Sequence, residues 1–213
     1  KSVFPEGRIV YLMSDGAALP IAFSKTVDIL KKERLIEQTI TFGHAFGGDL
    51  EAVNVYSALL AAKYVCQADA AVILMGPGVV GTGTKWGTTG LEQGEYLNAV
   101  TVLKGIPIAI LRMSEAEERT RHRWLSHHTL TVLQEITYSP CYVPLPNYAK
   151  NFEDVVNAVG SLEHNITWVD TDRAFLQLLK EHSNVTTLGR SPKEVPLFFQ
   201  AALAAGISAA QFG

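Results

Sequence analysis

With 213 residues, of which 47% are hydrophobic and 18% charged, the chain is long enough for one sizeable core, which favours a single α/β domain over residues 1–213. Its net charge of −3 offers no positive field for nucleic acid or anionic lipid, so neither is expected as a partner. Cys66 and Cys141 lie in apolar surroundings without Cys-x-x-Cys spacing, which favours buried thiols in a reducing cytoplasm.

No apolar run reaches the roughly 18 residues of a membrane span, and no charged-then-apolar leader is present. We therefore expect a cytoplasmic protein. The chain begins at Lys1 and not at a methionine, which indicates a fragment of a longer protein that lacks its N-terminal region.

Short β-rich runs alternate with longer helical patterns along the chain. The predicted strands are 8–14, 39–43, 70–75, 107–112, 141–144, 166–169 and 185–188. The predicted helices are 19–32, 50–66, 91–104, 128–136, 152–162, 173–181 and 195–210. Such alternation is typical of βαβ units with right-handed crossovers. It predicts an open, mostly parallel sheet of six or seven strands with helices on both faces, a Rossmann-like three-layer fold.

Ligands of open α/β sheets bind beyond the carboxyl ends of the strands, and polar residues follow four predicted strands here. Asp15 follows the first, His44 and Asp49 follow the second, a glycine-rich run follows the third, and a basic segment follows the fourth. The sequence therefore predicts one small-molecule site at this edge.

The glycine-rich run, 76–95, contains seven glycines in twenty residues. Its first six residues match G-x-G-x-x-G, but the loop continues to residue 90 before a helical pattern resumes, which disfavours NAD(P), and no Walker motif occurs. Backbone N–H groups and threonine hydroxyls predict an anion cradle, formed by Gly76, Gly78, Gly81, Thr82, Gly83 and Thr84. The alternative is a structural loop packed against another subunit.

Carboxylates mark two predicted helix starts. Asp49 is either an N-cap or a site residue, and Glu51 begins a polar stripe on the helix predicted at 50–66. Glu92 and Glu95 form a similar pair, which either shares a proton or cation or lies on a solvated helix face. A divalent cation on Asp15, Asp49, Glu92 or Glu95 stays open.

The basic segment, 119–129, holds three of the six histidines. Arg121 and Arg123 either clamp an anion or balance the acidic run 115–118. His127 and His128 are expected to point to different sides of a regular helix, so that both cannot bind one metal, although the first could turn into the site at a helix start. No His-Glu-x-x-His motif is present.

Several segments together resemble a family of uncharacterised bacterial proteins, domain of unknown function family 3866. They are 14–20 (SDGAALP), 44–54 (HAFGGDLEAVN), 75–84 (MGPGVVGTGT), 92–95 (EQGE) and 126–129 (SHHT). Trp124 stands where the family pattern has glycine. The resemblance implies a shared fold and site, a longer amino end, and no known activity, substrate or cofactor.

The leading hypothesis is an enzyme that acts on a small anionic or phosphorylated metabolite. The alternative is a non-catalytic module for ligand sensing or oligomer assembly. An assembly module would form a homo-oligomer. The predicted catalytic residues are His44, His127, Asp15, Asp49 and Glu95, with a histidine as general acid or base oriented by an aspartate. The predicted ligand-binding residues, besides the cradle Gly76, Gly78, Gly81, Thr82, Gly83 and Thr84, are Glu92, Arg121, Arg123 and His128. The sequence does not identify a metal or a cofactor.

Overall fold

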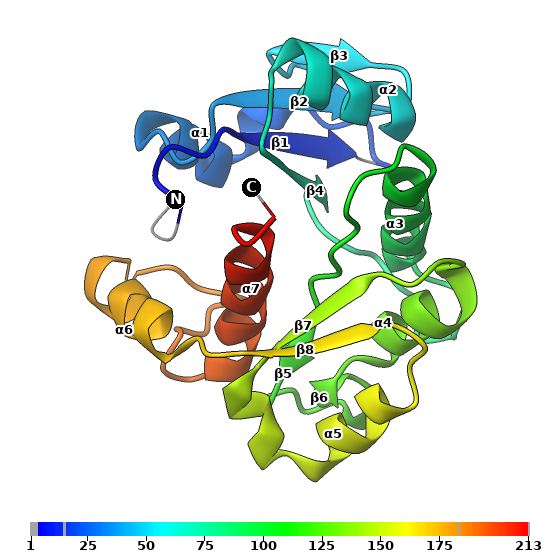
Figure 1. Cartoon of the computed structure of the whole chain (residues 1–213), viewed down its shortest axis with the longest axis vertical. Helices are drawn as coiled ribbons and strands as arrows, with labels where there is room; N and C mark the ends of the chain where they lie inside the picture. The colour runs from blue at the N-terminus through cyan, green and yellow to red at the C-terminus, as the bar shows by residue number, and fades with distance from the viewer. Residues whose placement is uncertain (1–3, 15, 183, 213) are drawn as a thin grey trace. The chain divides into compact units, whose positions relative to one another are not determined.

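The computed structural model describes residues 4–14, 16–182 and 184–212 (Figure 1). These residues form two compact units. The N-terminal unit comprises the chain up to Thr89 together with Val102–Lys104, and the C-terminal unit comprises Gly90–Thr101 and Gly105–Phe212. The expectation of a single domain stays a prediction.

The N-terminal unit is built on a four-stranded parallel sheet in the order β3-β2-β1-β4. The strands are β1 (Ile9–Ser14), β2 (Gln38–Phe42), β3 (Leu50–Ala52) and β4 (Ala70–Met75). The side chains of Val10 and Leu12, which point to one face of the sheet from central β1, are fully buried. A small core of Met13, Ile21, Val27, Ile36 and Ala45 packs beside the sheet.

The helical segments of this unit are shorter than the sequence predicts. They are the 3-10 turn η1 (Ile21–Phe23), α1 (Lys25–Lys32), α2 (Val55–Leu60) and the π-helical turn η2 (Ala61–Val65). The helix predicted from residue 19 begins only at residue 25, because the hydroxyl of Ser24 accepts a hydrogen bond from the Val27 N–H and caps α1 there.

The helix predicted at 50–66 is wrong in its first turn. Residues 50–52 form β3, which pairs with β2, and α2 begins after Asn54. Asn54 and Ser57 form a capping box, each side chain accepting from the other's backbone N–H, at 3.1 and 3.2 Å. Asp49 is therefore not a helix cap, and Glu51 does not share a helix face with these two residues.

The C-terminal unit packs helices around a short parallel strand pair, β7 (Tyr142–Pro146) and β8 (Asn165–Val169) (Figure 1). A second pair, β5 (Met113–Ser114) and β6 (Trp124–Leu125), is antiparallel. The helices are α3 (Glu92–Val102, whose last residue belongs to the N-terminal unit), α4 (His127–Thr131), α5 (Glu153–Gly160), α6 (Asp172–Glu181) and α7 (Pro196–Ala209). Shorter turns are η3 (Thr89–Leu91, begun in the N-terminal unit), η4 (Thr120–His122), η5 (Val132–Ile136) and η6 (Asn147–Asn151).

Helix α7 is the centre of this unit's core. It contacts β5, β7 and β8, and its side chains Leu197, Ala201 and Ala204 are almost completely buried. The residues around it, among them Val143 and Leu145 of β7, form one large hydrophobic cluster. The cluster holds the short strands in place and makes the unit compact without a large sheet.

Two predicted strands of this unit are wrong. Residues 107–112 make one parallel bridge, Ile108 to Tyr142, after which Arg112 bonds to the segment of Ser126 and Thr129. Residues 185–188 form no strand, because Thr187 pairs with Arg190 across a tight turn, with Leu188 at φ +50° and Gly189 at φ +78°. The α/β class is confirmed, but the described residues contain a four-stranded parallel sheet and two strand pairs in place of one sheet of six or seven strands.

None of the helices in the described ranges has both the length and the apolar character needed to cross a membrane.

Candidate metal centre

Three histidines of the C-terminal unit, His122, His127 and His128, come together at the start of α4. Each histidine offers one potential metal-binding nitrogen, and these three nitrogens lie within 4.8 Å of one another. The ring centroids are 4.8 Å apart for His122 and His127, 5.1 Å for His122 and His128, and 3.9 Å for His127 and His128. We call these three residues the histidine cluster.

The local sequence explains how the cluster forms. Ser126 is the N-cap of α4, and its hydroxyl oxygen accepts from the His128 N–H at 3.3 Å, so both neighbouring histidines stand in the first helical turn. His122 ends η4 and returns through β6, where Trp124 has φ +63°. That left-handed conformation explains why glycine is expected at this position. Here the indole stacks on Phe152, with ring centroids 4.3 Å apart.

His127 and His128 lie at the start of a helix, the exception to the expectation that neighbouring histidines point to different sides. Their ligand atoms belong to the same cluster, because at the start of a helix the two rings converge even though the residues are neighbours in the sequence. Within the described chain, His127 Nε2 and His128 Nδ1 are buried and have no hydrogen-bond partner. Buried polar atoms are normally paired, so these two nitrogens require an explanation.

The cluster favours neutral imidazoles. Burial, reinforced by Arg119 and the other two histidines, lowers the pKa of His122 to about 4. Burial and then Arg121 lower the pKa of His127, and burial and then His127 lower that of His128. Neutral imidazole is the form that binds metals.

Arginines surround the cluster, and one carboxylate balances them in part. Glu117, only 9% exposed, accepts from Arg119 Nε at 2.9 Å and from Arg112 Nη2 at 3.2 Å. The hydrogen bonds from Arg119, followed by those from Arg112, lower the pKa of Glu117 to about 2. Arg121 is exposed and makes no ion pair with any described residue. One carboxylate therefore faces two guanidinium groups, and Arg121 adds further positive charge.

The residues fit a three-histidine metal site. Nitrogens bound to a tetrahedral zinc ion are about 3.3 Å apart, since each lies about 2.0 Å from the metal, so small side-chain rotations would close the cluster. Three protein ligands leave the fourth position open, as in catalytic zinc sites. Among the described residues of either unit, no other group of three potential ligands lies together. The cation left open on Asp49, Glu92 or Glu95 stays a prediction, since these residues belong to no such group among the described ones.

In the N-terminal unit, the parallel strands bring two predicted segments to one edge. β2 and β4 flank β1 in parallel, so the turn with His44 and the glycine-rich loop both leave from the carboxyl ends. His44 is exposed. Asp15 lies outside the described residues. Asp49 binds Lys31 Nζ at 2.7 Å and accepts from the Thr39 N–H at 2.9 Å, a contact that ties two elements together.

The glycine-rich loop uses its threonine hydroxyls internally. Thr82 Oγ1 lies 3.0 Å from Thr84 Oγ1 and 3.1 Å from the Gly87 carbonyl oxygen, and the Gly87 N–H donates to Thr84 Oγ1. Positive φ angles occur at Gly78 and Gly83. The loop therefore folds on itself, and its role as an anion cradle stays a prediction.

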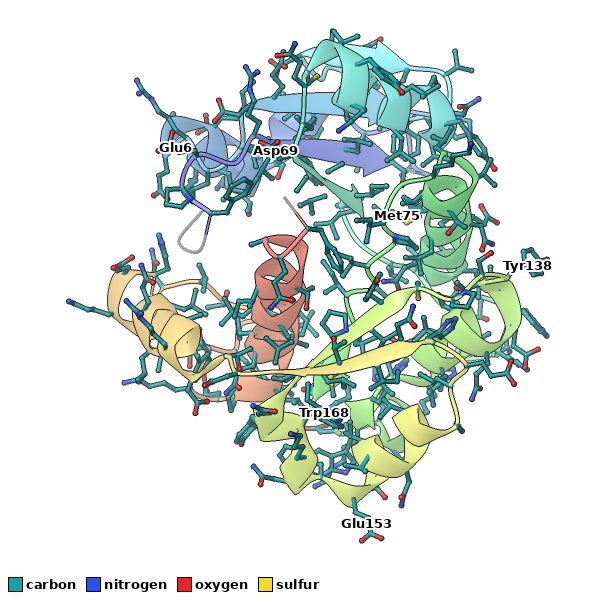
Figure 2. All side chains as sticks on the ribbon, in the orientation of Figure 1. Glu6, Asp69, Met75, Tyr138, Glu153 and Trp168 are labelled. Atoms are coloured by element: carbon teal, nitrogen blue, oxygen red, sulfur yellow. The ribbon has the colours of Figure 1, made fainter. Side chains whose placement is uncertain are left out.

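The predicted residues on α3 have other contacts. Glu92 contacts the Tyr96 hydroxyl, and Glu95 is exposed. Asn98, three residues after Glu95 on α3, donates to the Ile136 carbonyl at 2.8 Å and accepts from the N–H of Tyr138, the exposed residue labelled in Figure 2. Arg123 lies over the Trp124 ring. Glu92 and Asn98 therefore have partners within the protein, and a ligand-binding role for Glu92 and a catalytic role for Glu95 stay predictions.

Sequence reasoning did not select His122 as a site residue and only counted it among the three histidines of the basic segment. The signal was present, because three histidines occur within seven residues, 122–128. What the pattern could not show is that Ser126 and β6 turn the chain so that the first histidine faces the other two.

The fold and the site define an α/β protein with a three-histidine cluster set among arginines. The chain belongs to the family described as "Protein of unknown function (DUF3866)", whose model matches residues 1–206, which confirms the resemblance stated above. No curated protein and no solved structure matches the chain.

Proposed function

We propose that the chain binds a divalent transition metal ion, zinc in the first place, through His122, His127 and His128, and acts with it on a small anionic molecule. The observation that carries the proposal is the convergence of three imidazoles with two buried ring nitrogens that lack a partner in the described chain. An ion held this way offers its open position to a substrate oxygen and stabilises negative charge that develops there.

The charges around the cluster support an anionic substrate. Glu117 balances only part of the positive charge of Arg112 and Arg119, and Arg121 is exposed with no ion-pair partner among the described residues. A divalent ion added to this surplus needs a negative ligand nearby. A carboxylate or phosphate oxygen at the open position, with Arg121 as counter-charge, meets that need.

The competing explanation is a purely structural cluster of neutral, stacked histidines. It accounts for the lowered pKa values and the ring contacts. It does not account for two buried nitrogens without partners, each of which costs free energy when unsatisfied. Metal binding separates the two explanations.

The test is a titration of metal-free protein with Zn²⁺ by calorimetry, and with Co²⁺ by visible absorption, which reports coordination number and geometry. We expect one ion per chain and a four-coordinate spectrum. Thermal unfolding should shift upward with Zn²⁺, since a ligand that binds only the native state stabilises it.

The matched variants are His128→Ala and His182→Ala, the second being a partly exposed histidine outside the cluster. His128→Ala should weaken zinc binding by at least about 100-fold, since even an outer-shell change costs 10–100-fold, and His182→Ala should leave it unchanged. Equal affinity in both variants, or no binding by the unaltered chain, would refute the metal site. A screen of phosphate esters and carboxylates on the zinc-loaded protein then tests the anionic substrate.

One observation favours the second candidate, an assembly module. In the N-terminal unit, Tyr56, Leu60 and Tyr64 recur every four residues along α2 and η2, with Val53 just before α2, and each of the four is at least 42% exposed. An apolar stripe of this kind fits a contact with a second copy of the chain. Light scattering tests this contact by comparing the molar mass of Tyr64→Glu in solution with that of the unaltered chain. A monomeric mass for both proteins would exclude the contact.

A further inference from the structure

We infer that the metal is held by a mixed set of ring nitrogens, Nε2 of His122, Nε2 of His127 and Nδ1 of His128, and that Ser126 is the positioning residue that imposes this set. The inference rests on the proposed metal site and deepens it. It names the ligand atom of each histidine and a residue outside the cluster that selects it.

The assignment for His122 follows from its hydrogen bond. Nδ1 of His122 lies 2.9 Å from Ser126 Oγ, and both side chains are buried, with Ser126 fully inaccessible. Water therefore does not compete for this contact. With Nδ1 engaged by the hydroxyl, only Nε2 is left to bind an ion. A neutral ring that gives Nε2 to a metal carries its proton on Nδ1, and Ser126 Oγ accepts that proton's hydrogen bond.

The assignments for the other two histidines follow from their unpartnered atoms. Nε2 of His127 and Nδ1 of His128 are buried and, in the described chain, bond to nothing. A metal ion would supply the partner that each of these two nitrogens lacks. One potential ligand nitrogen from each of the three rings lies within 4.8 Å of the other two.

Ser126 connects two of the ligands directly. Its oxygen accepts from the backbone N–H of His128 at 3.3 Å while it contacts the ring of His122 at 2.9 Å. A hydroxyl oxygen has two lone pairs and can accept both bonds at once. One atom therefore sets the position of His128 at the helix start and the orientation of the His122 ring.

The test is an NMR measurement on the full chain, with isotope-labelled imidazole nitrogens and an NMR-active cadmium isotope as the probe ion. A one-bond coupling between cadmium and nitrogen identifies each ligand atom. We expect coupling to Nε2 of His122, Nε2 of His127 and Nδ1 of His128, with a proton retained on Nδ1 of His122. Coupling to Nδ1 of His122 or Nε2 of His128 would overturn the assignment while leaving the metal site intact. Absence of any bound ion, with Zn²⁺ also failing to bind, would overturn both proposals.

The role of Ser126 is tested by Ser126→Gly, because glycine preserves most N-cap stability and removes only the hydroxymethyl group. We expect Zn²⁺ affinity to fall 10–100-fold and the His122 Nδ1 proton signal to be lost to exchange. Ser24→Gly is the matched control, since Ser24 caps α1 in the same way, with no histidine bonded to it in the described chain. Should Ser126→Gly keep both the affinity and the proton signal, Ser126 is only a helix cap.

Discussion

The imidazole rings of His127 and His128 have centroids 3.9 Å apart, although the two residues are neighbours in the sequence. In the middle of a helix, neighbouring side chains point about 100° apart. The convergence arises because both residues lie in the first turn of α4, directly after the N-cap Ser126. Placing two uncharged rings together costs little free energy, whereas protonating either ring would cost much more.

The first prediction concerns acid stability of the metal-free chain. The pKa of His122 is lowered from 6.5 to about 4 in the folded protein. Between these values the unfolded chain takes up a proton that the folded chain refuses, so stability falls as the pH falls from 6.5 towards 4. Urea unfolding across this range should show the decline, and it should be shallower in His122→Gln. Parallel pH profiles for the two proteins would contradict the burial of His122.

The second prediction concerns Glu117, which binds Arg112 and Arg119. Its pKa is lowered from 4.5 to about 2, so its contribution is complete above pH 4.5 and is lost as the pH falls through about 2. Glu117→Gln should reduce the free energy of unfolding at neutral pH by about 3 kcal/mol, because two guanidinium groups lose their counter-charge.

The control for this prediction is Glu118→Gln, an exposed neighbour for which a change within about 0.5 kcal/mol is expected. Glu117→Gln should also flatten the acid limb of the stability profile. If the two variants unfold at the same urea concentration, the network around Glu117 does not stabilise the fold.

The third prediction concerns a helix cap made by a distant side chain. Glu115 Oε1 accepts from the Leu197 N–H at 3.0 Å, at the start of α7. Glu115→Ala leaves that N–H without its acceptor and should cost about 1 kcal/mol in the free energy of unfolding. Glu115→Gln keeps an acceptor oxygen and should cost less. Glu163→Ala, at an exposed position, serves as the control. An equal loss in Ala and Gln variants would show that charge at the helix start, not the hydrogen bond, matters.

The fourth prediction concerns Gly87 in the glycine-rich loop. A Cβ there would overlap the hydroxyl oxygens of Thr82 and Thr84, so Gly87→Ala should break the internal threonine contacts. We expect a loss of about 1–3 kcal/mol or faster proteolysis within the loop. Gly206→Ala is the comparison, because its Cβ meets nothing within 4 Å on helix α7 and should stabilise by up to about 1 kcal/mol. Normal proteolysis of Gly87→Ala would show that the loop adapts easily.

The sequence predicted β1, β2, β4, β7 and β8 within a few residues, because buried apolar runs of strand length are a local signal. It failed at 107–112, which makes a single bridge, and at 185–188, which leads into a tight turn, although both segments contain apolar or β-branched residues. At 50–66, the helical pattern was correct only after Asn54, since pairing with β2 competes with the helix for residues 50–52.

The sequence by itself determined the α/β class, the parallel strands that set one edge of the N-terminal unit, and the basic, histidine-rich segment 119–129. It could not determine the site, because a metal centre depends on the directions of side chains, and those are set by caps and turns whose partners are distant. Only the tertiary structure decided that His122 faces His127 and His128, that Ser126 lies between them, and that the threonines of the glycine-rich loop bind one another.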